Sequence, residues 1–158
     1  MIAPVVGMVP GGNFKSEVWQ IGILNNGKMF MRYAAQPSGT SGSGASKVFD
    51  GDWHHVAIVC SYDSESNKST YRMFVDYRLD FLMNYTGKYA TSKKCDLYVG
   101  GYLDPGRKFN GMIDELRVSG TALRPEQFLR RYSPFVDSDT VAYLPLDGKN
   151  GEVLPARY

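Results

Sequence analysis

The sequence predicts an all-β fold, and three observations support this prediction. Segments of strand-forming residues recur about every ten residues along the chain, a spacing that is typical of a β-sandwich or barrel. Aromatic residues (11 Tyr, 8 Phe and 2 Trp) and 17 glycines are abundant, which favours short strands joined by many turns. Only residues 124–131 show a helical pattern, so the 158 residues are expected to form one domain with one short surface helix.

The first clear elements are predicted to form a hairpin. Residues 17–24 alternate imperfectly between apolar and polar side chains. Asn-Asn-Gly follows at 25–27, and this is a turn signal because Asn and Gly tolerate positive φ. Residues 28–34 are the predicted return strand. Residues 37–46 are rich in Gly and Ser with no apolar side chain to bury, so we expect a flexible loop there.

The middle and the end of the chain continue in the same way. Further strands are predicted at 53–60, 70–76, 97–100, 112–119 and 137–147. Residues 63–69 are polar and are expected to form a turn. Residues 78–94 are expected to form the longest irregular connection between strands, and such connections often carry function.

The charge and hydropathy of the chain disfavour some classes of function. The net charge of +2 at pH 7 is too small to indicate binding of nucleic acid or of a membrane surface. No stretch approaches the roughly 20 apolar residues that a membrane-spanning helix needs. The first ten residues lack a basic region and a small-residue cleavage pattern, so no signal peptide is expected within this chain.

Five short sequence motifs follow one another between residues 49 and 127. They read FDGDWHHVA at 49–57, FVD at 74–76, LYVGG at 97–101, FNGMIDELRV at 109–118 and TALRPEQ at 121–127. In this order they resemble the motifs of laminin G-like jelly rolls of the concanavalin A-like kind. The resemblance implies an antiparallel jelly-roll sandwich of two sheets, a secreted or cell-surface protein, and a glycan or extracellular protein as partner.

Two features depart from the pattern of that family. Tyr77 stands where the family usually has Gly after Val-Asp, so this hairpin is expected to lack the usual Gly-containing turn. Two strands that normally precede the equivalent of residues 2–9 are missing. Residues 2–9 or their neighbour are therefore expected to form an open edge, to which another chain can add a strand.

The C-terminal residues 139–158 allow two interpretations. Residues 139–148 resemble the opening strand of a domain of this family. We expect them to supply the closing strand of a single domain that spans residues 1–158, because an unpaired apolar strand would expose its edge. The alternative is that they begin a following module.

Asp114 is a candidate metal ligand. Period-two alternation places it on the face of Met112, Leu116 and Val118, where a carboxylate needs a partner because an unpaired buried charge is very costly. Ca²⁺ takes oxygen ligands, and the resemblance implies a structural calcium near this motif, with Asp147 as a second ligand. The alternative is a carboxylate that accepts backbone N–H bonds at the strand end.

Aromatic side chains are candidates for sugar binding, because their apolar faces can stack on a pyranose ring. The candidates share a position in or beside a predicted loop. They are Tyr77, Phe81, Tyr85, Tyr89 and Tyr102. The alternative is that these rings cap the core of the sandwich.

The sequence contains few candidates for catalytic residues. His54 and His55 are the only histidines; they are predicted to lie mid-strand on opposite faces, and Trp53 and one of them are expected to pack. No Glu-x-Asp-x-Glu run supplies the paired carboxylates of a glycosidase. We therefore expect a non-catalytic recognition module. The alternatives are a structural or assembly domain attached to a glycan-processing enzyme such as a sialidase and, less favoured, a glycan hydrolase.

Overall fold

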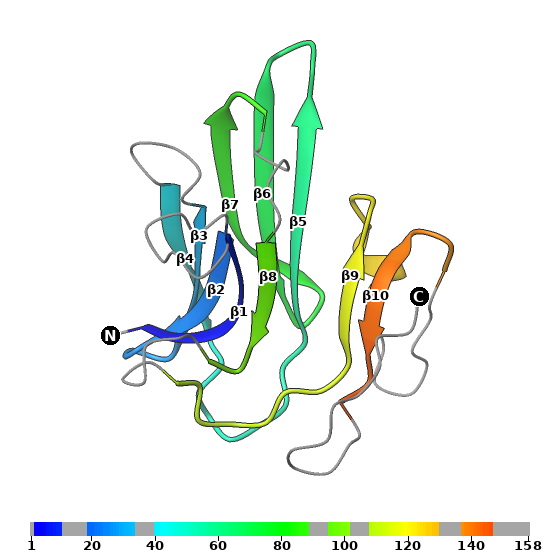
Figure 1. Ribbon diagram of the computed structural model, residues 1–158. Helices are drawn as coiled ribbons and strands as arrows, with labels where there is room; N and C mark the ends of the chain where they lie inside the picture. The colour runs from blue at the N-terminus through cyan, green and yellow to red at the C-terminus, as the bar shows by residue number, and fades with distance from the viewer. Residues whose placement is uncertain are drawn as a thin grey trace. The chain divides into compact units, whose positions relative to one another are not determined.

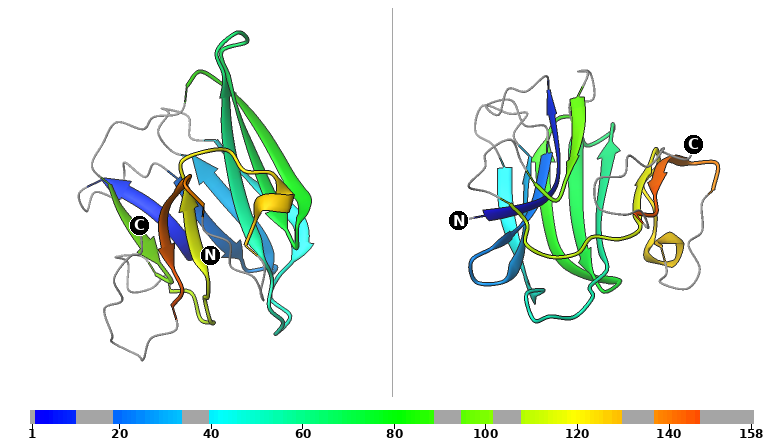
Figure 2. Two further views of the ribbon diagram at one scale, coloured as in Figure 1. Left: turned by 90° about the vertical axis from the view of Figure 1, so that its right-hand side faces the viewer. Right: turned by 60° about the horizontal axis from the view of Figure 1, so that its bottom comes forward.

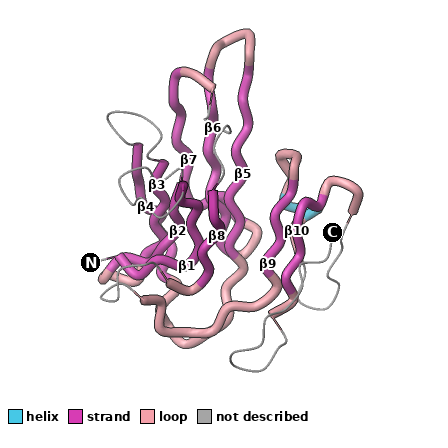
Figure 3. Tube along the Cα trace, viewed as in Figure 1, coloured by secondary structure: helices cyan, strands magenta, loops and turns pink. Residues whose placement is uncertain are grey.

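A computed structural model of the chain describes residues 2–10, 19–33, 40–88, 95–101, 108–129 and 137–146 (Figure 1). The predicted all-β fold is confirmed, because the regular structure of these residues is ten strands and one 3-10 turn (Figure 3). In this part of the chain no helix is long and apolar enough to cross a membrane. The chain divides into two compact units, Met1–Asn110 and Gly111–Tyr158.

The larger sheet of the first unit is antiparallel, with the strand order β4-β3-β2-β1-β8. Its strands are β1 (Ile2–Pro10), β2 (Trp19–Leu24), β3 (Lys28–Tyr33), β4 (Thr40–Lys47) and β8 (Cys95–Val99). The predicted hairpin around residues 25–27 is confirmed as the β2–β3 connection. Of the two predicted positions for an open edge, residues 2–9 are excluded, since β1 pairs with β2 on one side and with β8 on the other. Its neighbour β8 takes the edge position among the strands that the structure describes.

The smaller sheet of the first unit has the order β5-β6-β7. Its strands are β5 (Val56–Asp63), β6 (Lys68–Val75) and β7 (Arg78–Thr86). The prediction of an irregular connection from residue 78 onward is wrong as far as residue 86. The reason is a period-two pattern in β7: Phe81, Met83 and Tyr85 are buried or half-buried, while Leu82 and Asn84 between them are exposed.

Strand β4 occupies most of the segment that was predicted to be a flexible loop. Its Gly-rich and Ser-rich sequence has no apolar side chain to bury, but its backbone pairs with β3. Gly42 and Gly44 also allow β7 to approach β4 closely. A Cβ atom at Gly42 would collide with the ring of Phe81, and one at Gly44 would collide with the carboxylate of Asp80. These glycines therefore serve packing and not flexibility.

The core of the first unit lies between its two sheets, which face each other (Figure 2). Its buried side chains come from both sheets and are Ile23, Met29, Met31, Tyr33, Tyr71, Met73, Val75 and Met83. The ring centroids of Tyr33 and Tyr71 are 5.1 Å apart across the core, a distance at which tilted aromatic pairs attract each other. The two sheets thus form the predicted sandwich.

The second unit contains an antiparallel pair of strands, β9 (Leu116–Ser119) and β10 (Thr140–Leu144). Strand β9 begins later than the predicted strand at 112–119. The helix predicted near residues 124–131 is a single 3-10 turn, η2 (Pro125–Gln127), and residues 130 and 131 lie outside the described part. Because β10 pairs with β9, residues 140–144 do have strand character. A single domain over residues 1–158 stays a prediction.

Replacing Gly44 with Ala is expected to destabilise the protein by about 1–3 kcal/mol, the usual cost of overpacking. The added methyl group would push Asp80 away from β4. Gly101→Ala is the matched control, since a Cβ there would meet nothing within 4 Å. Urea unfolding of both variants measures the difference, and equal stabilities would contradict the close approach of β7 to β4.

Candidate functional site

The β6–β7 hairpin ends in a two-residue turn formed by Asp76 and Tyr77. Their φ angles are 49° and 67°, a left-handed pair that is typical of tight hairpin turns. The prediction of a turn without Gly at this point is thus confirmed. The ring of Tyr77 stacks on the imidazole of His55 with centroids 4.4 Å apart and planes inclined by 14°. This contact helps to hold a Tyr in a backbone conformation that is unfavourable for it.

The loop between β4 and β5, residues 48–55, lies at the same end of the first unit. The N–H of Val48 donates to the carbonyl of Gly27 in the β2–β3 turn at 2.9 Å. Two further backbone groups join the loop to the β6–β7 turn. Asp76 N–H donates to the carbonyl of His55 at 2.8 Å, and His55 N–H donates to Oδ1 of Asp76 at 3.0 Å. Three connections of the sandwich therefore meet here.

His54 joins the loop to the turn through its side chain. Its Nδ1 lies 2.8 Å from Oδ2 of Asp76, and its Nε2 lies 3.0 Å from Oδ1 of Asp50. Both nitrogens donate at once only when the ring is protonated. The hydrogen bond to Asp76, with a smaller contribution from Asp50, raises the pKa of His54 above its ordinary value despite burial. The predicted mid-strand position of both histidines is wrong, since β5 begins at Val56.

Asp50 also shapes the loop itself. Its Oδ1 accepts the N–H of Asp52 at 3.0 Å, and Gly51 between them has φ of 96°, which favours Gly. The Asp52 N–H, together with His54, holds the pKa of the Asp50 carboxyl below its ordinary value. The FDGDWHH motif and the FVD motif thus build one hydrogen-bonded network.

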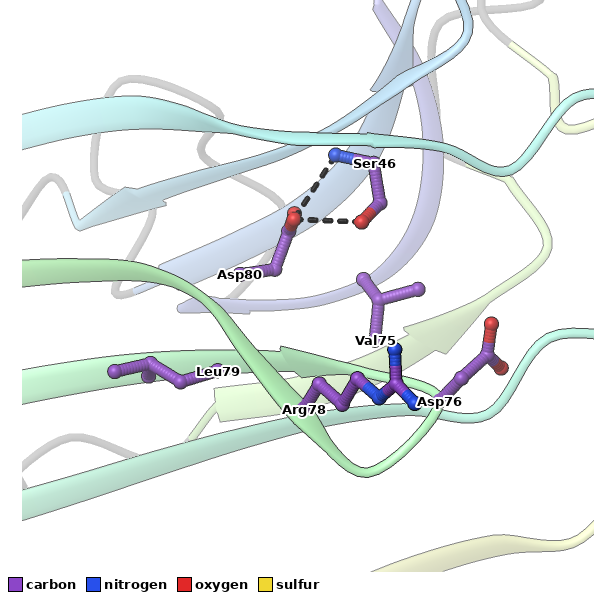
Figure 4. A pocket seen from close by; sticks show the side chains of 6 residues that line it. All are labelled: Ser46, Val75, Asp76, Arg78, Leu79 and Asp80. Atoms are coloured by element: carbon purple, nitrogen blue, oxygen red, sulfur yellow. Dashed lines mark hydrogen bonds between the residues drawn. The ribbon is translucent and has the colours of Figure 1, made fainter.

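A pocket of about 290 Å³ lies beside this network (Figure 4). Its lining comes from β4 and from the β6–β7 hairpin and consists of Ser46, Val75, Asp76, Arg78, Leu79 and Asp80. Asp80 turns toward β4, where its Oδ1 accepts the N–H groups of Ala45 and Ser46 at 3.2 and 2.9 Å and the Ser46 hydroxyl at 2.7 Å. Arg78 contributes a positive charge and N–H donors to the lining.

Of the five aromatic residues predicted to bind a ligand, the three that the structure describes do not gather at one site. Tyr77 stacks on His55. Phe81 is half-buried and packs against the core, while the half-buried ring of Tyr85 is 6.0 Å from that of Tyr33. Tyr89 and Tyr102 lie outside the described residues. A role of these five residues in ligand binding stays a prediction.

Two other aromatic rings are exposed at the end of the first unit where the loops meet. Phe49 is 75% exposed and Trp53 is 51% exposed, so the expectation that Trp53 packs is wrong. Both rings belong to the β4–β5 loop. Sequence reasoning missed them because it continued the strand pattern of β5 backward through Trp53. The Gly-containing Asp-Gly-Asp sequence just before it was the signal for a loop.

Asp114 lies in the loop before β9 and not on a strand face. It is exposed, and its Oδ1 accepts the N–H of Glu115 at 3.0 Å. Met112, which was predicted to share a buried face with it, is 74% exposed. The period-two argument is therefore wrong here. Asp114 accepts a backbone N–H, which agrees with the alternative interpretation given above.

The calcium site itself stays a prediction, because Asp147 lies outside the described residues. Within the described ranges, no group of three or more His, Cys, Asp or Glu side chains could hold a metal ion. Asp114 keeps a second carboxylate oxygen and is exposed, which is compatible with a Ca²⁺ ligand in a loop.

The first unit is thus an antiparallel β-sandwich whose loops gather aromatic, acidic and basic side chains at one end. Residues 4–128 match the family described as the concanavalin A-like lectin/glucanases superfamily, and the chain belongs to this family. The resemblance in the sequence is thereby confirmed.

One solved structure that the chain matches is that of an S-layer domain-containing protein of Clostridium thermocellum, residues 221–444. The two chains are 20% identical with a TM-score of 0.40, and the match covers 80% of this chain and 60% of that chain. Among curated proteins, the comparison found no match.

Replacing Asp80 with Ala is expected to destabilise the protein by about 1–3 kcal/mol, because it removes the acceptor of two backbone N–H groups and one hydroxyl. Asp63→Ala is the matched control. Asp63 accepts one backbone N–H and one Ser hydroxyl, but only within its own turn. Urea unfolding should show the larger loss for Asp80→Ala, and the reverse order would contradict a role of Asp80 in joining the sheet edges.

Proposed function

We propose that this chain is a non-catalytic recognition module of an extracellular or cell-surface protein. It binds carbohydrate at the end of the first unit, where the β4–β5 loop meets the β6–β7 turn. The observation that carries this proposal is the exposure of two aromatic rings, Phe49 and Trp53, on a loop that His54 ties to the pocket residue Asp76. Membership of a family of lectins and glucanases supports it.

The chemistry at this end suits a sugar. Aromatic faces provide apolar stacking surface, and Trp53 and Phe49 offer it to solvent. The guanidinium of Arg78 can donate several N–H bonds to hydroxyl or carboxylate oxygens, and Leu79 beside it is 53% exposed. The pocket is small for a ligand site, which favours one sugar unit over a long segment of polymer.

The carboxylates at this end favour binding over hydrolysis. A glycosidase needs one carboxylic acid that keeps its proton and one free carboxylate facing the scissile bond. Asp50 and Asp76 are both engaged by His54, and the low pKa of Asp50 is opposite to what a general acid requires. Oδ1 of Asp80 accepts backbone N–H groups of β4, and its Oδ2 is buried away from solvent.

A second candidate is an assembly domain, in which a strand of another chain pairs with this one. It is favoured by the edge position of β8 in the described part of the five-stranded sheet. An edge strand presents unpaired backbone groups on which a strand can add. Light scattering distinguishes this candidate, because it requires association whereas the recognition module does not.

Trp53→Ala is expected to weaken sugar binding about tenfold or more, since loss of a stacked ring costs on the order of 1.4 kcal/mol. A glycan array identifies the sugar, and titration calorimetry then compares the variants. Tyr62→Ala is the control, because this half-buried ring lies near the β5–β6 turn, at the other end of the strand. Arg78→Ala should also weaken binding.

Two outcomes would contradict this proposal. A folded protein that binds nothing on the array would exclude the carbohydrate. Equal affinities of Trp53→Ala and the unchanged protein, for a sugar that does bind, would place the site elsewhere.

A structural calcium held by Asp114 and Asp147 remains a separate proposal. Because an ion that binds only the folded state stabilises it, chelation by EDTA is expected to lower the melting temperature, and added Ca²⁺ to restore it. Asp114→Asn should reduce the difference between the two conditions. A melting temperature that EDTA leaves unchanged would exclude this calcium.

A further inference from the structure

The imidazole of His54 lies between two carboxylates that belong to different connections of the sandwich. Asp50 is four residues away in the β4–β5 loop, and Asp76 is in the β6–β7 turn. The His54 side chain is only 17% exposed, whereas the two carboxylates are about half exposed (47% and 51%). One ring therefore bridges two loops, and its exposed partners can separate without opening the core.

The bridge depends on a proton. The two N···O distances of 2.8 and 3.0 Å both require a donor on the ring. Neutral imidazole has one N–H, so its second nitrogen presents a lone pair. After loss of the proton, one of the two contacts would place that lone pair against a carboxylate, which is repulsive.

The contact with Asp50 is the one that breaks. Asp76 is fixed independently of His54, since it exchanges two hydrogen bonds with the backbone of His55. Apart from His54, the Asp50 carboxylate accepts the N–H of Asp52, which belongs to the same loop. Deprotonation thus leaves Nδ1–H on Asp76 and frees the part of the loop around Asp50.

We propose that His54 is a proton-dependent latch. When protonated, it holds the loop from Asp50 to Trp53 against the β6–β7 turn and beside the pocket. When neutral, it releases Asp50 and lets Trp53 move. The latch is a property of the folded chain and requires no ligand, so it does not rest on the proposed function. If sugar binds at this end, the latch makes its affinity depend on pH.

Several charged or titratable groups lie near His54, and the proposal assigns the change of protonation to His54 itself. Asp50 and Asp76 are the charged groups that act on its ring. Arg78 and Asp80 line the pocket next to Asp76, and Asp80 is engaged with β4. His55 is the second titratable ring nearby and stacks on Tyr77, so a test must separate the two histidines.

The direction of the pH dependence follows from the raised pKa of His54. A group whose pKa is higher in the folded than in the unfolded state stabilises the fold below its ordinary value, about 6.5 for His. That contribution is lost as pH rises through the folded-state pKa. The latch is therefore closed in mildly acidic solution, while the carboxylates are still ionised, and open in alkaline solution.

The experiment uses Trp53 as a reporter in a Trp19→Phe background, so that its fluorescence is the only indole signal. Acrylamide quenching of Trp53 is expected to rise about twofold between about pH 6 and about pH 9 as the loop opens. The midpoint should match the titration of the His54 ring followed by NMR.

Asp50→Asn is the decisive variant. The Asn side chain can still accept the N–H of Asp52 through Oδ1, and its amide can donate to neutral His54, so the latch should stay closed at both pH values. His55→Gln is the control and should keep the pH response. Quenching that is equal at the two pH values in the unchanged protein, or that still responds to pH in Asp50→Asn, would overturn the proposal. If the protein binds no sugar on the glycan array, the proposed function fails but the latch proposal is unaffected.

Discussion

The close approach of β7 to β4 is the constraint on which the pocket and the adjoining β4–β5 loop and β6–β7 turn depend. These two strands belong to different sheets, and Asp80 joins them by accepting two backbone N–H groups of β4. An edge strand normally exposes such groups to other chains, so the carboxylate also covers part of this edge. The arrangement requires that no side chain stand at Gly42 or Gly44, which explains a strand composed largely of Gly and Ser.

The same hairpin positions the rest of the site. Four residues before Asp80, Asp76 turns the chain and holds both histidines of the β4–β5 loop. Residues that maintain the fold and residues that shape the pocket are thus largely the same. Trp53 and Phe49 differ, because their rings are exposed. Under the proposed function, changes at these two positions are expected to alter sugar binding with little effect on stability, whereas changes at Asp76 or Asp80 are expected to affect both.

Much of the fold was predictable because the local sequence indicates several of its strands and turns. The Asn-Asn-Gly turn fixes the β2–β3 hairpin, and apolar or β-branched residues mark β5 and β6. Strand β4 was not predictable from its own residues, because its stability comes from pairing with β3 and from the approach of β7. The site was missed for a related reason: the hydrogen bonds of His54 reach a residue 22 positions away, and strand periodicity contains no such information.

The bonds of His54 also give a physical reason why the FDGDWHH and FVD motifs occur together in this chain. Asp76 adopts positive φ and presents its carboxylate to a ring nitrogen and a backbone N–H of the other motif. A half-buried imidazole without Asp76 would lose one of its two acceptors, and burial would then favour its neutral form. Asp76 of the FVD motif therefore favours the protonated form of His54 in the FDGDWHH motif. We infer that a residue unable to accept hydrogen bonds at position 76 is compatible with this loop only if position 54 changes as well.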